Sequence, residues 1–124
     1  MKSIVTLLIL LLCSQLINAQ VAYKTFHVSN ELHQRYKVNY PKLEVGMDKT
    51  TVNKLLGQPH YEHKLITKKG INKGSVYIYY IRRMHPDLIN EKHDISFSVY
   101  FNNDDKLIST YASNTEEFAV IGAQ

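Results

Sequence analysis

The sequence predicts an α+β domain, in which one or two short N-terminal helices pack on a three- to four-stranded antiparallel meander sheet. Three observations support this fold class: a helix with clear start and stop signals near residue 50, strand-like segments after Pro59, and strict alternation of apolar and polar residues from Ile95 to Phe101. Helices that precede a run of hairpin-linked strands cover one face of the sheet in such folds.

The N-terminal residues 1–19 have the layout of a cleaved secretory signal. Lys2 gives a positive start, residues 4–12 are almost entirely apolar, and Ala19 supplies the small residue before the cleavage site. The apolar run is much shorter than the roughly 20 residues of a membrane-spanning helix. We therefore expect an exported chain that begins at Gln20. Lipidation of Cys13 is the less favoured alternative, because Leu12 stands where a lipoprotein signal has a small residue.

Residues 20–39 form an N-terminal segment with one short helix. Ser29 or Asn30 is expected to cap this helix over residues 30–37, and its buried face would carry Val28, Leu32 and Tyr36.

The strongest helix signal follows directly in the sequence. Asp48 has the position of an N-cap whose carboxylate accepts from free amides, Met47 and Val52 have the spacing of a hydrophobic staple, and Gly57 can adopt the positive φ that ends a helix. The full motif comprises Gly46, Met47, Asp48, Val52, Leu55, Leu56, Gly57 and Pro59.

Four strand-like segments follow, over residues 61–67, 76–82, 95–101 and 106–112. In the third segment the apolar side chains should face the helices, and Ser96, Ser98 and Tyr100 should point away from them. Residues 113–124 form a C-terminal tail, of which Phe118, Val120 and Ile121 could dock on the sheet.

Residues 40–112 resemble the SmpA/OmlA family, also called BamE-like. The resemblance rests on Lys42-Leu43-Glu44-Val45-Gly46-Met47 before the helix, Leu56-Gly57-Gln58-Pro59 at its end, and the later segments Tyr77-Ile78-Tyr79 and Phe97-Ser98-Val99-Tyr100-Phe101. The same architecture resembles the repeated unit of β-lactamase inhibitor proteins (BLIP). The resemblance implies a non-enzymatic accessory of outer-membrane protein assembly or envelope integrity. Such a protein binds partner subunits in the periplasm or at the periplasmic face of the outer membrane, and touches anionic lipid.

Two features depart from the family pattern. The signal lacks the lipoprotein cleavage box, and Tyr77 stands where the family often has Trp. The alternative function is therefore a secreted or periplasmic inhibitor or ligand-binding domain on the BLIP-like fold.

Tyrosines are the candidate partner-binding residues. The chain has nine Tyr and no Trp, and tyrosine is enriched at the energetically dominant positions of interfaces. We expect an outer sheet face, opposite the helices, that carries some or all of Tyr77, Tyr79, Tyr100 and Tyr111. The competing interpretation, that the C-terminal tail covers these rings, has equal weight.

Basic residues mark two ends of the predicted sheet. Arg82, Arg83 and Lys92 are weak candidates for lipid headgroup contact. The Lys68–Lys73 turn is expected at the opposite end, beside Asp104 and Asp105, which would partly neutralise it.

We find no pattern that predicts catalysis, a cofactor or a metal. His60 and His63 should lie on opposite sides of a strand, and His85, Asp87, His93 and Asp94 show no convergent ligand spacing. Without Lys2 the net charge falls from +4 to +3, which is too mild to require a nucleic-acid partner.

Overall fold

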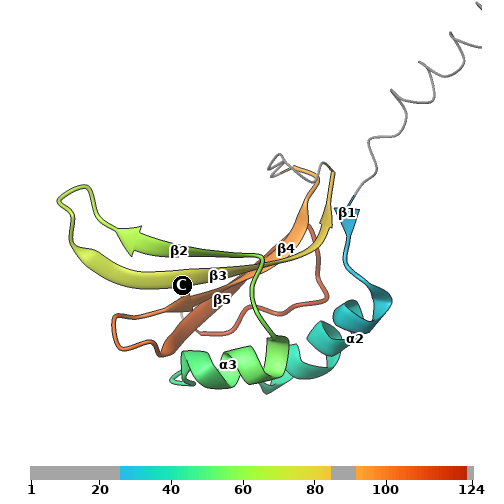
Figure 1. The fold of residues 1–124 in the computed structure, drawn as a ribbon, viewed down its shortest axis with the longest axis horizontal. Helices are drawn as coiled ribbons and strands as arrows, with labels where there is room; N and C mark the ends of the chain where they lie inside the picture. Colours follow the sequence, from blue (N-terminus) through green and yellow to red (C-terminus); the bar gives the residue numbers. More distant parts are fainter. Residues whose placement is uncertain (1–25, 85–91, 123–124) are drawn as a thin grey trace, which may run out of the picture.

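The structure is a computed structural model, and it describes residues 26–84 and 92–122. The expected signal peptide and the loop residues His85 and Asp87 lie outside the described residues. The elements are β1 (Phe26–His27), α2 (Asn30–Asn39), the 3-10 turn η1 (Tyr40–Lys42), α3 (Lys49–Leu56), β2 (Tyr61–Ile66), β3 (Asn72–Arg83), β4 (Ile95–Phe101) and β5 (Leu107–Ser113). Both helices lie on the same side of a strongly curved sheet (Figure 1), which confirms the predicted α+β fold.

The sheet has five antiparallel strands. The meander of β2, β3, β4 and β5 is as expected, whereas the two-residue β1 is an addition that the sequence did not predict. β1 and β2 pair with the same edge of β3: Phe26 lies opposite Arg83, and Tyr61 lies opposite Ile78. A short stretch of the β3 edge is therefore left between the ends of β1 and β2.

The predicted helix motif forms α3, but its N-terminus is stabilised differently from the prediction. Asp48 is the N-cap residue, yet its side chain makes no capping hydrogen bond. Its carboxylate instead forms an ion pair with Lys106, which lies opposite Asp48 in an isolated β-bridge. The neighbouring backbone is tied to β5 as well, because Gly46 N–H donates to the carbonyl of Leu107 at 2.7 Å and Leu107 N–H donates to Met47 at 2.8 Å.

The C-terminus of α3 ends as predicted at Gly57, which has a φ of +81°. Its last carbonyls accept hydrogen bonds from α2 side chains. Arg35 donates from Nε to Leu55 O at 3.1 Å and from Nη2 to Lys54 O at 3.0 Å, and Asn39 donates to Leu55 O at 2.7 Å. These bonds satisfy carbonyls that no helical amide can reach, and they hold the two helices together.

Aromatic rings fill the core between the helices and the sheet. The centroid of the Phe97 ring lies 5.3 Å from that of Tyr36, 4.9 Å from that of Tyr79 and 4.6 Å from that of Phe118. Val52 and Leu56 of α3 are fully buried in the same cluster. The predicted inward face of β4 is confirmed, with Phe97, Val99 and Phe101 at 0% exposure.

Candidate partner-binding face

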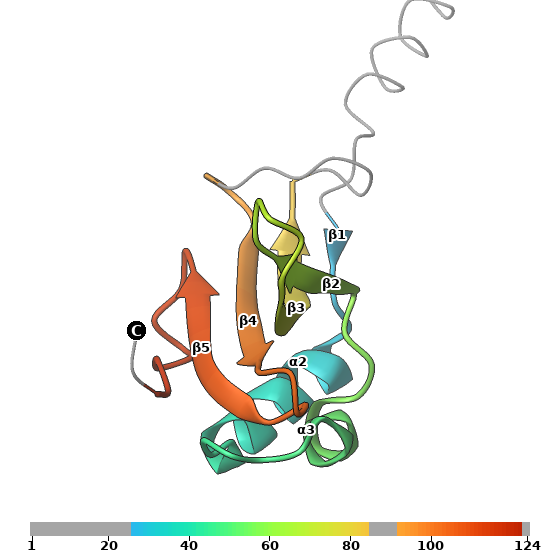
Figure 2. The same cartoon turned by 90° about the vertical axis from the view of Figure 1, so that its left-hand side faces the viewer.

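The sheet face opposite the helices is defined by the strand pairing. Side chains of directly opposed residues share a face, and Ser98 of β4 lies opposite both Ile78 of β3 and Tyr111 of β5. This outer face has no helix over it in the part of the chain that the structure describes, as Figure 2 shows. The strand pairing places on this face Tyr61, His63, Val76, Ile78, Tyr80, Ser96, Ser98, Tyr100, Ser109, Tyr111 and Ser113.

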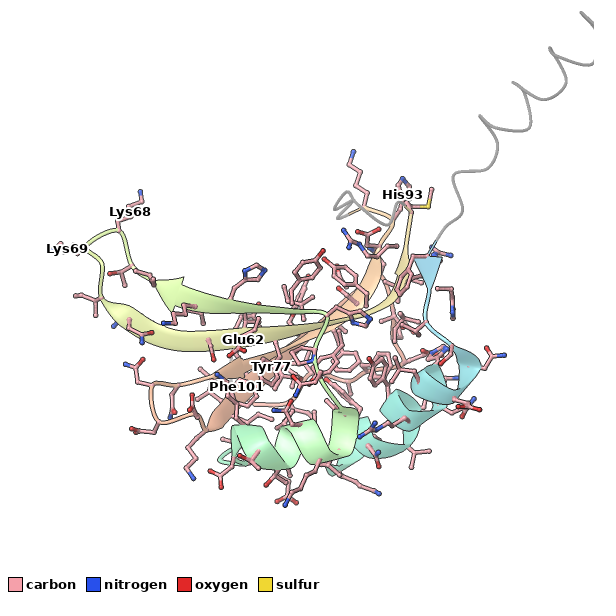
Figure 3. The ribbon with its side chains drawn as sticks, viewed as in Figure 1. Glu62, Lys68, Lys69, Tyr77, His93 and Phe101 are labelled. Atoms are coloured by element: carbon pink, nitrogen blue, oxygen red, sulfur yellow. The ribbon has the colours of Figure 1, made fainter. Side chains whose placement is uncertain are left out.

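The expected position of Tyr77 and Tyr79 on this face is wrong. Tyr77 is 4% exposed and Tyr79 is 0% exposed, and both lie in the core cluster on the helix side. Figure 3 shows Tyr77 and Phe101 on the α3 side of the sheet. The Tyr79 hydroxyl donates to Gly57 O at 3.2 Å, and burial raises its pKa far above the usual range for a phenol. These two tyrosines therefore support the fold and do not face a partner.

Tyr100 and Tyr111 do lie on the outer face. Together with Ile108 and Ser109 they line a shallow depression of about 280 Å³, which we call the outer patch. Tyr111 is 50% exposed and Ile108 is 41% exposed. Ile108 reaches this face because the pairing of β4 with β5 shifts register between Tyr100 and Phe101. An exposed cluster of apolar and aromatic side chains is typical of an interaction site.

The described part of the C-terminal tail docks on the core from the helix side and leaves Tyr111 50% exposed. Phe118 is 2% exposed and its ring centroid lies 5.0 Å from that of Tyr40 on the helix side. The tail then follows β5, where Thr110 N–H donates to Ile121 O at 2.9 Å and Ile121 N–H donates to the Thr110 hydroxyl at 2.8 Å. The interpretation in which the tail covers the outer tyrosines is therefore wrong.

Two further tyrosines lie on the outer face near its other edge, and the sequence did not single them out. Tyr61 is 40% exposed, whereas Tyr80 is 5% exposed. The Arg83 guanidinium carbon lies 4.6 Å from the Tyr80 ring centroid and 5.6 Å from the Tyr61 ring centroid. The two faces of β3 are equally apolar in the sequence, with residues 76, 78 and 80 on one face and residues 77, 79 and 81 on the other. This similarity was the signal that Tyr80 belongs to a second apolar surface.

The basic residues proposed for lipid contact are not equally available. Arg83 is 5% exposed, so its expected role in lipid headgroup contact conflicts with its burial. Arg82 is half-buried and donates from Nη2 to His93 O at 3.3 Å, and Lys92 is exposed. Any headgroup contact at this end of the sheet would therefore fall to Arg82 and Lys92.

The opposite end of the sheet combines basic and acidic residues, as expected. Lys68 and Lys69 lie at the tip of the β2–β3 loop, far from His93 (Figure 3). Asn103 Nδ2 donates to Asn72 O at 2.9 Å, which brings the β4–β5 turn beside this loop. Lys49 lies in the same region and forms ion pairs with Glu62 at 2.8 Å and with Asp105 at 3.4 Å. Despite the opposing effect of burial, these carboxylates raise the pKa of Lys49.

Two of the residues considered as metal ligands, His60 and Asp94, make structural hydrogen bonds. His60 Nδ1 accepts a hydrogen bond from Tyr80 N–H at 3.0 Å, and Asp94 Oδ1 accepts one from Met84 N–H at 2.9 Å. No group of three potential ligands exists among the described residues. In the same ranges, no helix combines the length and apolar character needed to cross a bilayer.

Comparison with known protein families identifies the family of this chain. Residues 35–111 match the family model described as the outer membrane protein assembly factor BamE domain. No curated protein and no solved structure matches the chain. The matched residues include α3 with its N-cap Asp48 and its C-terminal Gly57, and the meander from β2 into β5. Because it covers more than half of the sequence, the chain belongs to the BamE domain family of outer-membrane protein assembly factors.

Proposed function

We propose that this chain is an exported, non-enzymatic accessory of outer-membrane protein assembly that binds a protein partner through the outer patch. The observation that best supports this proposal is the exposure of Tyr111 and Ile108 beside Tyr100, on a sheet face that no described element covers. Tyrosine combines a large apolar ring with a polar hydroxyl and loses little rotamer freedom when it binds.

The surroundings of the outer patch suit a protein surface. The surface around the aromatic rings carries small polar side chains, those of Ser96, Ser98 and Ser109. A polar surround of this kind is found at the rim of many interfaces. Cationic groups do not line the depression itself. The patch therefore favours an apolar and aromatic partner surface over a charged one. We further propose that Arg82 and Lys92 add a weak contact with anionic lipid, since each basic residue at such a surface contributes about 1 kcal/mol.

Site-specific photo-crosslinking in living cells tests the proposed patch. A photoreactive residue at position 108 or 111 should capture a subunit of the outer-membrane assembly machinery, identified by mass spectrometry. Val38 and Val45 are suitable control positions, because they are 61% and 59% exposed and belong to the helix side. Equal capture of the same subunit from the control positions would contradict a binding site on the outer patch.

A charge-insertion variant tests the functional consequence. Ile108→Glu combined with Tyr111→Glu should lower the amount of β-barrel protein in the outer membrane, while the melting temperature changes little because both side chains are exposed. Normal β-barrel protein levels in this variant would exclude a role for the patch in assembly. Capture of a soluble enzyme from position 111 would favour the inhibitor alternative.

A further inference from the structure

A second pocket lies at the sheet edge, apart from the outer patch. It has a volume of about 310 Å³ and is lined by Phe26, His60, Tyr61 and Arg83. Phe26 belongs to β1, and His60 directly precedes β2, so the pocket occupies the gap that these two strands leave along β3. None of its lining residues belongs to the outer patch.

The cation in this pocket is buried and incompletely paired. Arg83 is 5% exposed, and its Nη1 donates to the Tyr61 hydroxyl at 3.1 Å. Its Nε is shielded from solvent and donates to no acceptor. Arg83 forms none of the ion pairs found among the described residues.

Such an arrangement is costly unless an anion completes it. Moving a cation out of water carries a large desolvation penalty, and the rings of Tyr61 and Tyr80 offset only part of it through cation–π attraction. A guanidinium presents its N–H groups in a planar fork that matches the two oxygens of a carboxylate. We propose that this pocket binds a carboxylate group carried on an apolar body.

The remaining lining residues define the ligand further. Phe26 and Tyr61 offer apolar ring surfaces, which suit a hydrocarbon or aromatic body. Burial, and secondarily the Arg83 charge, lower the pKa of His60, so its imidazole is neutral at neutral pH. The guanidinium of Arg83 is therefore the one positive charge among the residues that line the pocket. A single positive charge matches a monoanion better than a doubly charged phosphate.

Binding of phenylacetate to the exported chain tests this inference, with phenylacetamide as the uncharged control of the same shape. Amide chemical shifts of the ¹⁵N-labelled protein report the site through His60, Tyr61 and Arg83. For a ligand of this size we expect a dissociation constant on the order of millimolar, and binding of the amide at least ten-fold weaker. Equal binding of acid and amide would overturn the proposal, as would no binding of the acid.

Two variants assign the interaction to Arg83. Arg83→Met should weaken phenylacetate binding at least ten-fold, and Lys68→Gln, which removes an exposed cation at the opposite end of the sheet, should leave it unchanged. Unchanged affinity in a folded Arg83→Met protein would overturn the assignment. If this variant does not fold, Arg83→Lys serves in its place: it keeps the charge but lacks the fork, so unaltered binding would contradict bidentate recognition.

The source of the carboxylate is decided by two further titrations. Binding of an apolar peptide with a free C-terminus, but not of its amidated form, would place the carboxylate on a polypeptide; binding of phenylacetate alone would indicate a free small acid. Arg83-dependent binding of inorganic phosphate or anionic phospholipid vesicles without binding of phenylacetate would overturn the proposal. The crosslinking at positions 108 and 111 does not involve Arg83, so failure of either proposal leaves the other intact.

Discussion

At the scale of single residues, His60 couples the stability of the sheet edge to pH. Its Nδ1 accepts a hydrogen bond from Tyr80 N–H, which only the neutral ring can do. Burial, followed by the nearby Arg83 charge, lowers the pKa of this ring from its usual 6.5. The unfolded chain therefore binds the proton more readily than the folded chain does, and the free energy of unfolding must fall as the pH drops below about 6.5.

His60→Asn isolates this effect, because the Asn side chain offers an oxygen acceptor that does not titrate. Between pH 7 and pH 5 we expect the wild-type chain to lose more stability than the variant. The excess loss should not exceed about 1.4 kcal/mol per pH unit, since one proton is involved. Urea denaturation at several pH values measures both. The contact between His33 and Glu117 is present in both proteins and cancels in the comparison. Parallel pH profiles would show that His60 carries no linked proton.

Asp48 shows which contacts the sequence could not predict. Its position as the N-cap of α3 followed from local spacing alone, and the structure confirms it. The ion pair of its carboxylate with Lys106 joins residues 58 positions apart, and no local pattern reports that proximity. Local rules therefore place the residue in its element, while tertiary contacts select the partner of its side chain.

At the scale of elements, strand alternation could assign Tyr100 to a face, because apolar and outward-facing side chains alternate strictly along β4. Tyr111 follows a short turn, but the register shift between Tyr100 and Phe101 means that counting residues across this turn does not assign Tyr111 to the outer face. A longer connection joins β3 to β4, and both faces of β3 are apolar. Neither turn counting nor alternation could assign Tyr77 and Tyr79, which the structure places opposite Val99 and Phe97 in the core.

Gly74 in β3 gives a prediction at the same scale. Its φ is +121°, and a Cβ atom there would lie 1.9 Å from the carbonyl oxygen of Phe101. Gly74→Ala must therefore push β3 away from β4, at an expected cost of about 3 kcal/mol or more. Gly70→Ala is the matched control, because Gly70 has a φ of +79° but open space around it. It should cost only about 1 kcal/mol. Chemical denaturation compares the two, and equal losses would refute the close approach.

At the scale of the whole molecule, the tail completes the core. The family match ends at residue 111, yet Phe118 packs against Phe97 and Tyr40. The Tyr40 hydroxyl contacts the Thr110 hydroxyl at 2.7 Å and donates to Ala119 O at 2.6 Å. The sequence suggested that the tail could dock on the sheet. Its three apolar residues follow neither helix nor strand periodicity, so they could not show which face of the sheet the tail contacts.

Removing the Phe118 ring should therefore destabilise the domain as a core substitution does. Phe118 is 2% exposed, and Phe118→Ala would leave a cavity beside Phe97 at an expected cost of about 3–5 kcal/mol. Val120→Ala is the matched control in the same tail: Val120 is 54% exposed, so its loss should change stability by no more than about 0.5 kcal/mol. Thermal and urea melts of both variants measure the difference. If the two variants melt alike, the tail does not contribute to the core, and residues 26–113 should then fold with full stability on their own.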